Sequence, residues 1–73
     1  MKITVNGVER ECAAATLTEL WRAEIALLEL AEIEEPRGFA ISLNGAVVRR
    51  AAWPSTAVRE GDAVEIIRAM SGG

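Results

Sequence analysis

The stretch MKITVNGVEREC (residues 1–12) decides the fold, because it predicts two strands joined by a tight turn. Apolar residues alternate with polar ones at Ile3 and Val5, and Val8 follows directly after Asn6-Gly7. An Asn-Gly pair between such segments is the strongest short-range signal for a β-hairpin, since both residues tolerate positive φ. We therefore expect strands over residues 2–6 and 8–12.

A helix is expected next, in ATLTELWRAEIALLELAEIEE (residues 15–35). Thr16 is the expected N-cap, and Glu19, three residues later, completes a capping box. We expect a helix over residues 17–23 that continues toward residue 31.

One face of this helix is apolar at helical spacing, but a carboxylate interrupts it. Glu24 falls in the middle of that face, so either the helix breaks or shifts register near residues 23–24, or Glu24 lies at the edge of the buried face. Trp21 is interpreted as a core residue. The apolar face comprises Leu17, Leu20, Trp21, Leu28 and Ala31.

A second hairpin follows the helix. Residues 36–38 (PRG) predict a turn, and FAISL (residues 39–43) predicts a strand. Asn44-Gly45 is a second hairpin turn, and AVVRR (residues 46–50) is the expected return strand. The two hairpins therefore carry the same turn signal on either side of the predicted helix.

The last third of the chain predicts one more strand. We expect AAWPSTAV (residues 51–58) to be irregular, because the proline pushes Trp53 out of the helical region. REGD (residues 59–62) predicts a tight turn, and AVEIIRA (residues 63–69) predicts the final strand.

The order hairpin, helix, hairpin, strand predicts an α+β fold of the β-grasp, or ubiquitin-like, type. The first and last strands are apolar enough for the middle of a sheet, and a right-handed crossover through the helix makes them parallel. We expect a mixed sheet of four to five strands with one main helix packed on one face. Residues 1–69 form this domain, and residues 70–73 form a flexible tail.

Composition excludes several function classes. The chain has 73 residues, no histidine, one cysteine and a net charge of −3. The acidic balance argues against nucleic acid as a partner. Too few soft ligands are present for a metal site, histidine-based catalysis is impossible, and no bound cofactor is expected. No apolar run is long enough to span a membrane. We expect a cytoplasmic protein that is not itself an enzyme, with Cys12 a small buried apolar residue.

The chain ends on two glycines, which make a poor end for a folded element. Because the other catalytic groups are missing, the carboxylate of Gly73 is the best candidate for a reactive group. Five extended residues from residue 69 onward span about 17 Å at most, so a tail could carry this carboxylate into the site of another protein. Without Cβ atoms, Gly72 and Gly73 could thread a narrow channel.

The chain resembles the ThiS family of sulfur carrier proteins, which are β-grasp proteins. The resemblance is densest in AISLNGAVVRRAAW (residues 40–53), continues through EGDAVEII (residues 60–67) and ends on Gly72-Gly73. Two features depart from the family pattern. The family often has proline where Arg49 stands, and the segment 23–35 is several residues longer than usual.

The resemblance implies a chemistry for Gly73. A ThiF-like, ATP-dependent enzyme would adenylate its carboxylate, and sulfur from a donor protein would convert it to a thiocarboxylate. A ThiG-like thiazole synthase would then receive the sulfur for the thiazole ring of thiamine. Met70, Ser71 and Gly72 would be the tail that enters these partners. Ile67, with neighbours of like parity on the last strand, is a possible docking surface on the free face of the sheet.

Other hypotheses about the function remain open at this point. The small subunit of molybdopterin synthase shares the fold and the terminal Gly-Gly, although residues 66–70 (IIRAM) lack the aromatic residue and prolines that are frequent there. A carrier dedicated to cysteine or to another sulfur metabolite is also open. A ubiquitin-like modifier of other proteins, or a plain interaction module with an incidental tail, is the alternative from a different class.

Overall fold

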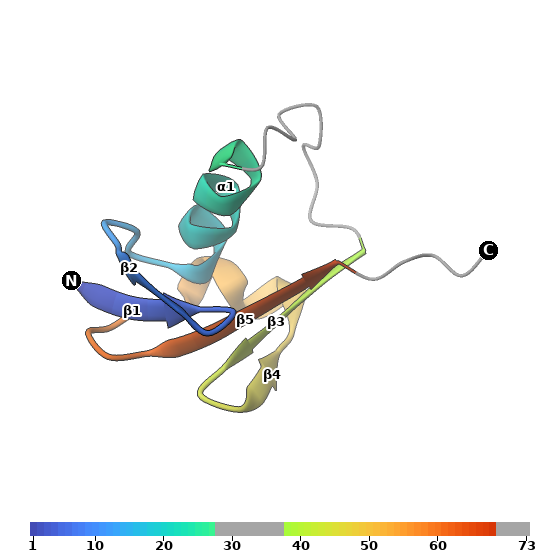
Figure 1. Ribbon diagram of the computed structural model, residues 1–73. Coiled ribbons are helices and arrows are strands. Elements are labelled where there is room, and N and C mark those ends of the chain that lie inside the picture. The colour runs from blue at the N-terminus through green and yellow to red at the C-terminus, as the bar shows by residue number, and fades with distance from the viewer. Residues whose placement is uncertain (28–37, 69–73) are drawn as a thin grey trace.

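The computed structural model of the chain describes residues 1–27 and 38–68. Within these residues it has one five-stranded sheet and one α-helix that crosses a single face of the sheet (Figure 1). The elements are β1 (Lys2–Val5), β2 (Val8–Glu11), α1 (Leu17–Leu27), β3 (Phe39–Leu43), β4 (Ala46–Val48), the 3-10 helix η1 (Arg50–Ser55) and β5 (Ala63–Arg68).

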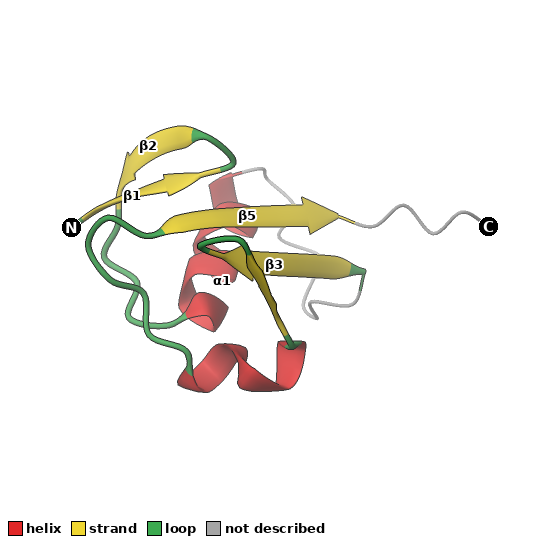
Figure 2. Ribbon diagram, turned by 90° about the horizontal axis from the view of Figure 1, so that it is seen from below, coloured by secondary structure: helices red, strands yellow, loops and turns green. Residues whose placement is uncertain are grey.

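The strand order confirms the predicted β-grasp sheet. It is β2-β1-β5-β3-β4, so the first and last strands lie inside the sheet. β1 and β5 are parallel, whereas β1–β2, β3–β4 and β3–β5 are antiparallel. Figure 2 shows the uncovered face, with β5 between β1 and β3.

Both Asn-Gly turns form as predicted. Asn6 and Gly7 have φ values of 51° and 80°, and Asn44 and Gly45 have values of 52° and 88°. Positive φ at both central positions is the signature of the type I′ turn, whose twist matches that of the strands. The first strands are one residue shorter than predicted: β1 ends before Asn6, because Asn6 already belongs to the turn.

The second strand also ends one residue early, at Glu11. Cys12 follows it and is buried, with 8% of its surface exposed, which confirms its interpretation as a small core residue. The backbone of Cys12 still pairs with Met1: the Cys12 amide donates to the Met1 carbonyl at 2.7 Å, and the N-terminal ammonium donates to the Cys12 carbonyl at 3.3 Å.

The helix begins at its predicted cap. The Glu19 amide donates to Oγ1 of Thr16 at 3.3 Å, and the Glu19 carboxylate reaches back to the amide of Ala15 at 3.3 Å. The helix then runs through Leu27, four residues beyond the segment 17–23, and the expected continuation to residue 31 lies outside the described residues beyond that point.

Glu24 does not break the helix, so of the two alternatives the break is wrong. Its side chain is 10% exposed. The Oε1 atom of Glu24 forms an ion pair with Nη1 of Arg10 on β2, at a distance of 2.6 Å. Glu24 therefore lies on the flank of α1 that faces β2, where a cation from the neighbouring strand compensates its burial.

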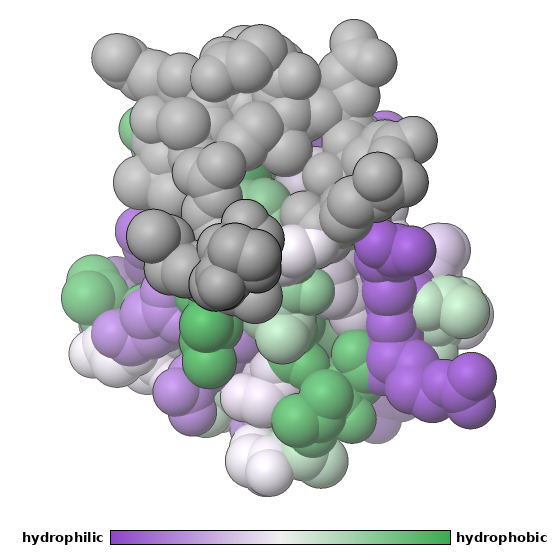
Figure 3. Space-filling model, turned by 90° about the vertical axis from the view of Figure 1, so that its right-hand side faces the viewer, coloured by the Kyte–Doolittle hydropathy of each residue, from purple (hydrophilic) through white to green (hydrophobic). Residues whose placement is uncertain are grey.

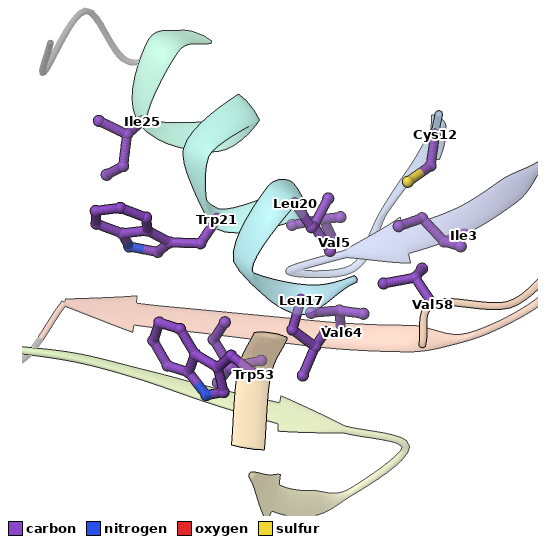
Figure 4. Close-up of a cluster of buried hydrophobic side chains, with 11 residues drawn as sticks. Ile3, Val5, Cys12, Leu17, Leu20, Trp21, Ile25, Trp53, Val58 and Val64 are labelled. Carbon is purple, nitrogen blue, oxygen red and sulfur yellow. The ribbon is translucent and has the colours of Figure 1, made fainter. Parts of the chain in front are cut away.

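The core lies between α1, η1 and one face of the sheet (Figure 4). Leu17, Leu20 and Trp21 are buried as predicted, whereas Leu28 and Ala31 fall outside the described residues. The ring of Trp21 meets Phe39 edge to face, with centroids 5.4 Å apart. The complete set of buried apolar residues is Ile3, Val5, Cys12, Leu17, Leu20, Trp21, Ile25, Ile41, Trp53, Val58 and Val64.

Two predictions for residues 46–58 are wrong. The return strand ends at Val48 instead of residue 50, and residues 50–55 form the helix η1 instead of an irregular segment. The reason is the burial of Trp53, which is 1% exposed and donates from Nε1 to the carbonyl of Val48 at 2.9 Å. This tertiary contact outweighs the local preference imposed by Pro54.

The predictions for the remaining segments hold within the described residues. β3 has the predicted bounds, and β5 covers the predicted last strand as far as Arg68. Gly38 is in a turn with φ 83°, while residues 36 and 37 lie outside the described part. In the ranges 1–27 and 38–68, no helix has the length and apolar character needed to cross a membrane.

Candidate functional site

The tail that carries the predicted reactive group follows directly on β5, the central strand of the sheet. Met70, Ser71, Gly72 and Gly73 lie outside the described residues, as does the predicted boundary between domain and tail. The structure therefore describes the part of the site that precedes the tail. This part comprises β5 and the surface around its carboxyl end.

The side chain of Asn6 fixes the carboxyl half of β5. Its Oδ1 accepts from the amide of Ile66 at 2.8 Å, and its Nδ2 donates to the carbonyl of the same residue at 3.2 Å. The backbone amide of Asn6 also donates to the carbonyl of Val64 at 2.9 Å. The turn residue therefore extends the pairing of β1 with β5 beyond the end of β1, two residues from the last described residue.

Asn44, in the other hairpin, fixes the opposite end of the same strand. Its Oδ1 accepts from the amide of Ala63 at 2.9 Å, and its Nδ2 donates to Oδ1 of Asp62 at 3.0 Å. Sequence reasoning assigned both asparagines to turns alone. The sequence signal for this arrangement was the Asn-Gly pair that occurs once before and once after the helix. Two identical turns could both contact the same strand.

The predicted docking residue Ile67 lies on the face of the sheet away from α1. It is 57% exposed, whereas Val64 on the same strand faces the helix and is 1% exposed. Ile67 stands opposite Ala40 of β3, which is also exposed. One strand further, Val47 of β4 is 78% exposed and stands opposite Ser42 of β3.

The neighbours that make this face apolar differ from those predicted. Residues of like parity on β5 include Glu65, an exposed carboxylate opposite Ser42, so the strand itself does not form an apolar row. The apolar neighbours come from β3 and β4. We call Ala40, Val47 and Ile67, together with Ser42 and Glu65, the outer face. Figure 3, which views the side of the molecule where β5 ends, shows apolar surface in its lower half between hydrophilic side chains.

The other half of the same sheet surface is charged. Register places Lys2 opposite Glu11 and Thr4 opposite Glu9. Lys2 and Glu9 form an exposed ion pair at 3.7 Å. The uncovered sheet thus grades from charged over β1 and β2 to apolar over β3, β4 and the end of β5.

The described part of the chain offers little chemistry of its own. Within residues 1–27 and 38–68, no group of three metal-ligating side chains is close enough to hold a metal ion. The single thiol, Cys12, is buried. What this part of the chain does present is the uncovered face of the sheet and the carboxyl end of β5.

Comparison with known proteins agrees with this arrangement. Residues 3–73 match the model of the ThiS family. The crystal structure of a thiamine biosynthesis protein (ThiS) from Geobacter metallireducens is 34% identical, with full coverage of both chains and a TM-score of 0.68. An NMR solution structure of a thiamine biosynthesis protein from the same organism is also 34% identical, covers 100% of this chain and 88% of that one, and has a TM-score of 0.65.

A third similar structure shares the fold at lower identity. It is the BexX/CysO complex from Amycolatopsis orientalis, which is 20% identical, covers 99% of this chain and 98% of that one, and has a TM-score of 0.61. No curated protein matches the sequence.

Proposed function

Because the chain belongs to the ThiS family of sulfur carrier proteins, we propose that its C-terminal carboxylate, on Gly73, is the group that carries sulfur for the thiazole ring of thiamine. One observation carries the proposal: the family match runs to Gly73 and includes the terminal Gly72-Gly73 pair. Members of this family are carriers and not enzymes themselves, which agrees with a sequence without histidine.

The chemistry requires activation because a carboxylate is a poor electrophile. In the proposed first step, a carboxylate oxygen of Gly73 attacks the α-phosphorus of ATP, and pyrophosphate leaves. In the second step, a hydrosulfide ion from the sulfur donor attacks the carbonyl carbon of the acyl-adenylate and loses its proton. The carbon–sulfur bond forms as the carbon–oxygen bond to AMP breaks, and the product is a thiocarboxylate. Both steps belong to a ThiF-like partner and a sulfur donor, and a ThiG-like thiazole synthase accepts the sulfur.

The fold would determine where a partner has to dock in order to reach Gly73. Five residues follow Arg68, and even fully extended they span no more than about 17 Å. A partner that acts on Gly73 must therefore dock close to the end of β5, and Ile67 lies there with 57% of its surface exposed. The outer face is accordingly the proposed docking surface.

Docking has to offset the ordering of the tail. Fixing the backbone of one residue costs about 1–2 kcal/mol, so ordering the flexible tail that the sequence predicts over residues 70–73 would oppose binding by roughly 4–8 kcal/mol. Burial of the apolar side chains of the outer face supplies part of the compensation. Because the side chain of Asn6 already fixes the carboxyl half of β5, fewer residues have to be ordered when a partner binds.

Intact-mass measurement tests the proposal. The protein is incubated with ATP, a sulfide source and the activating enzyme of the same organism. The expected result is a mass gain equal to the replacement of one oxygen by one sulfur, absent in a variant that lacks Gly73. An unchanged mass with an enzyme shown to be active on another carrier would contradict the proposal.

A second experiment identifies the acceptor. The thiocarboxylated protein is mixed with thiazole synthase, and the loss of its sulfur is followed by mass. Transfer to thiazole synthase supports the thiamine pathway. A stable thiocarboxylate that is consumed by a different acceptor would keep the carrier chemistry and contradict the assigned pathway.

A further inference from the structure

A hollow of about 320 Å³ lies between α1 and the β1–β2 hairpin, away from the outer face and from the end of β5. Its apolar wall includes Ile3 and Val5 of β1 and Leu20 and Leu27 of α1. Figure 4 shows Leu20, Val5 and Ile3 on the side of the core that is nearer to Cys12. We call this cavity the α1–β2 hollow.

The hollow is open to solvent and spanned by an ion pair. Among its lining residues, Ala23 and Leu27 of α1 and Glu11 of β2 are exposed. The pair between Arg10 of β2 and Glu24 of α1, 2.6 Å long, crosses from strand to helix. The pair therefore connects the two walls of the hollow, β2 and α1.

β2 is an edge strand, and its backbone has hydrogen-bonding groups to offer. Met1 and Cys12 exchange both backbone hydrogen bonds, so they form a hydrogen-bonded pair. Such pairs alternate with non-hydrogen-bonded pairs along an antiparallel ladder. The register then makes Ile3–Arg10 a hydrogen-bonded pair.

The intervening residues of β2 therefore direct their backbone outward. Glu9 stands opposite Thr4, and Glu11 stands opposite Lys2, both in non-hydrogen-bonded pairs. Their amide and carbonyl groups point away from β1, along the open edge. Within residues 1–27 and 38–68 no strand pairs with this edge, and a strand edge of this kind is a template for an added strand.

The charge around the hollow favours a basic partner. Its lining residues carry three carboxylates, those of Glu11, Glu19 and Glu24, against one guanidinium, that of Arg10. Glu11 also binds the N-terminal ammonium at 3.1 Å, but negative charge remains in excess. The whole chain, with a net charge of −3, adds to this field.

We propose that the α1–β2 hollow and the open edge of β2 together bind an extended segment of a partner protein, in which basic and aliphatic residues alternate. The segment adds a sixth strand beside β2 through the outward groups of Glu9 and Glu11. Because side chains alternate along a strand, every second residue faces the helix side, where an aliphatic side chain enters the hollow. The basic residues between them lie near the carboxylates of β2. This surface does not depend on the chemistry proposed for Gly73.

Amide hydrogen exchange with a defined probe tests the proposal. The probe is an acetylated and amidated peptide, KVKLKVK, and its control is KKVLVKK, which has the same composition without the alternation. We expect KVKLKVK to slow exchange at the amides of Glu9 and Glu11 by about tenfold or more when the site is saturated. The amide of Arg10, already bonded to β1, serves as the internal reference.

Two matched variants locate the binding site. Ala23 and Ala26 are both exposed on α1, but Ala23 lines the hollow and Ala26 does not. Ala23→Arg places a long cationic side chain in the opening and should weaken binding of KVKLKVK by about tenfold or more. Ala26→Arg makes the same change of charge elsewhere on the helix and should leave the affinity within about twofold.

Three results would overturn the proposal. One is exchange at Glu9 and Glu11 that KVKLKVK does not slow. Another is equal binding of KKVLVKK, or equal weakening by the two arginine variants, which would show attraction by net charge alone. The third is protection of Glu9 and Glu11 in the free protein together with a dimer in sedimentation, which would assign the edge to a second copy of this chain.

Discussion

The two faces of the sheet use the same strands for different purposes. On the face covered by α1, Ile3, Val5, Ile41 and Val64 are each at most 2% exposed. On the opposite face, Val47 and Ile67 are 78% and 57% exposed. Because successive side chains of a strand alternate in direction, one sequence pattern supplies both. The covered face stabilises the domain, and the uncovered face remains available for a partner.

The largest effect should come from removing Trp53 on the covered side. Trp53→Ala deletes a side chain that is 1% exposed and leaves the carbonyl of Val48 without its indole donor. Such truncations cost about 3–5 kcal/mol, a large part of the stability of a domain of this size. Urea denaturation should show a chain that is largely unfolded, while Val47→Ala on the outer face should change the free energy of unfolding by less than about 0.5 kcal/mol. Equal effects of the two variants would contradict the comparison.

The next effect concerns the one buried carboxylate among the described residues, Glu24. Glu24→Ala leaves Arg10 without its partner, and because Arg10 is 34% exposed, water replaces part of the interaction. We expect a loss of about 1–2 kcal/mol in the free energy of unfolding. Glu9→Ala, which breaks an exposed pair with Lys2, is the control and should cost less than about 0.5 kcal/mol. A double-mutant cycle with Arg10→Ala would reveal whether the loss comes from the pair.

A smaller effect is expected from the two asparagines that hold β5. Asn6→Gly and Asn44→Gly keep the positive φ but remove the side-chain bonds, so each should cost about 0.5–1.5 kcal/mol. Their local effects should differ. Asn6→Gly should speed hydrogen exchange at the amide of Ile66, and Asn44→Gly should do so at the amide of Ala63. Exchange that changes equally at both amides in both variants would show a loss of global stability rather than two separate clamps.

The smallest effect lies at the charged end of the uncovered sheet. The hydrogen bond from the N-terminal ammonium to Glu11 raises the pKa of that ammonium above its ordinary value of 8.0. Its stabilising contribution is therefore present below 8.0 and is lost as the pH rises through the raised pKa. The melting temperature should fall slightly over this interval, and Glu11→Gln should reduce the fall. A pH dependence that Glu11→Gln leaves unchanged would assign it to another group.

The sequence predicted the elements of this fold that depend on local signals. The turns at Asn6 and Asn44, the cap at Thr16 and the alternation in β3 and β5 are all encoded within a few residues. The helix η1 was not predicted, because it depends on the indole of Trp53 reaching Val48 and not on any local preference. The ion pair between Arg10 and Glu24 joins residues that only the packing of α1 on the sheet brings together.

The candidate site was predictable in part for the same reason. Strand parity placed Ile67 on the free face, but its apolar neighbours Ala40 and Val47 follow from the register across three strands, which a single sequence does not give. The pairing of Asn6 with Ile66 likewise needs the parallel arrangement of β1 and β5. The tail residues predicted to act lie beyond the described part of the chain, so their role stays a proposal.

One measurement tests most directly whether the uncovered face serves the chemistry of the tail. It is the rate of thiocarboxylate formation, followed by intact mass, for Ile67→Asp and Val8→Asp. The two residues are equally exposed, at 57%, but Ile67 lies on the outer face and Val8 lies on β2. We predict that Ile67→Asp lowers kcat/KM with the activating enzyme by about tenfold or more, while Val8→Asp leaves it within about twofold and both variants keep the unfolding midpoint of the parent. Equal rates for the two variants would contradict the account.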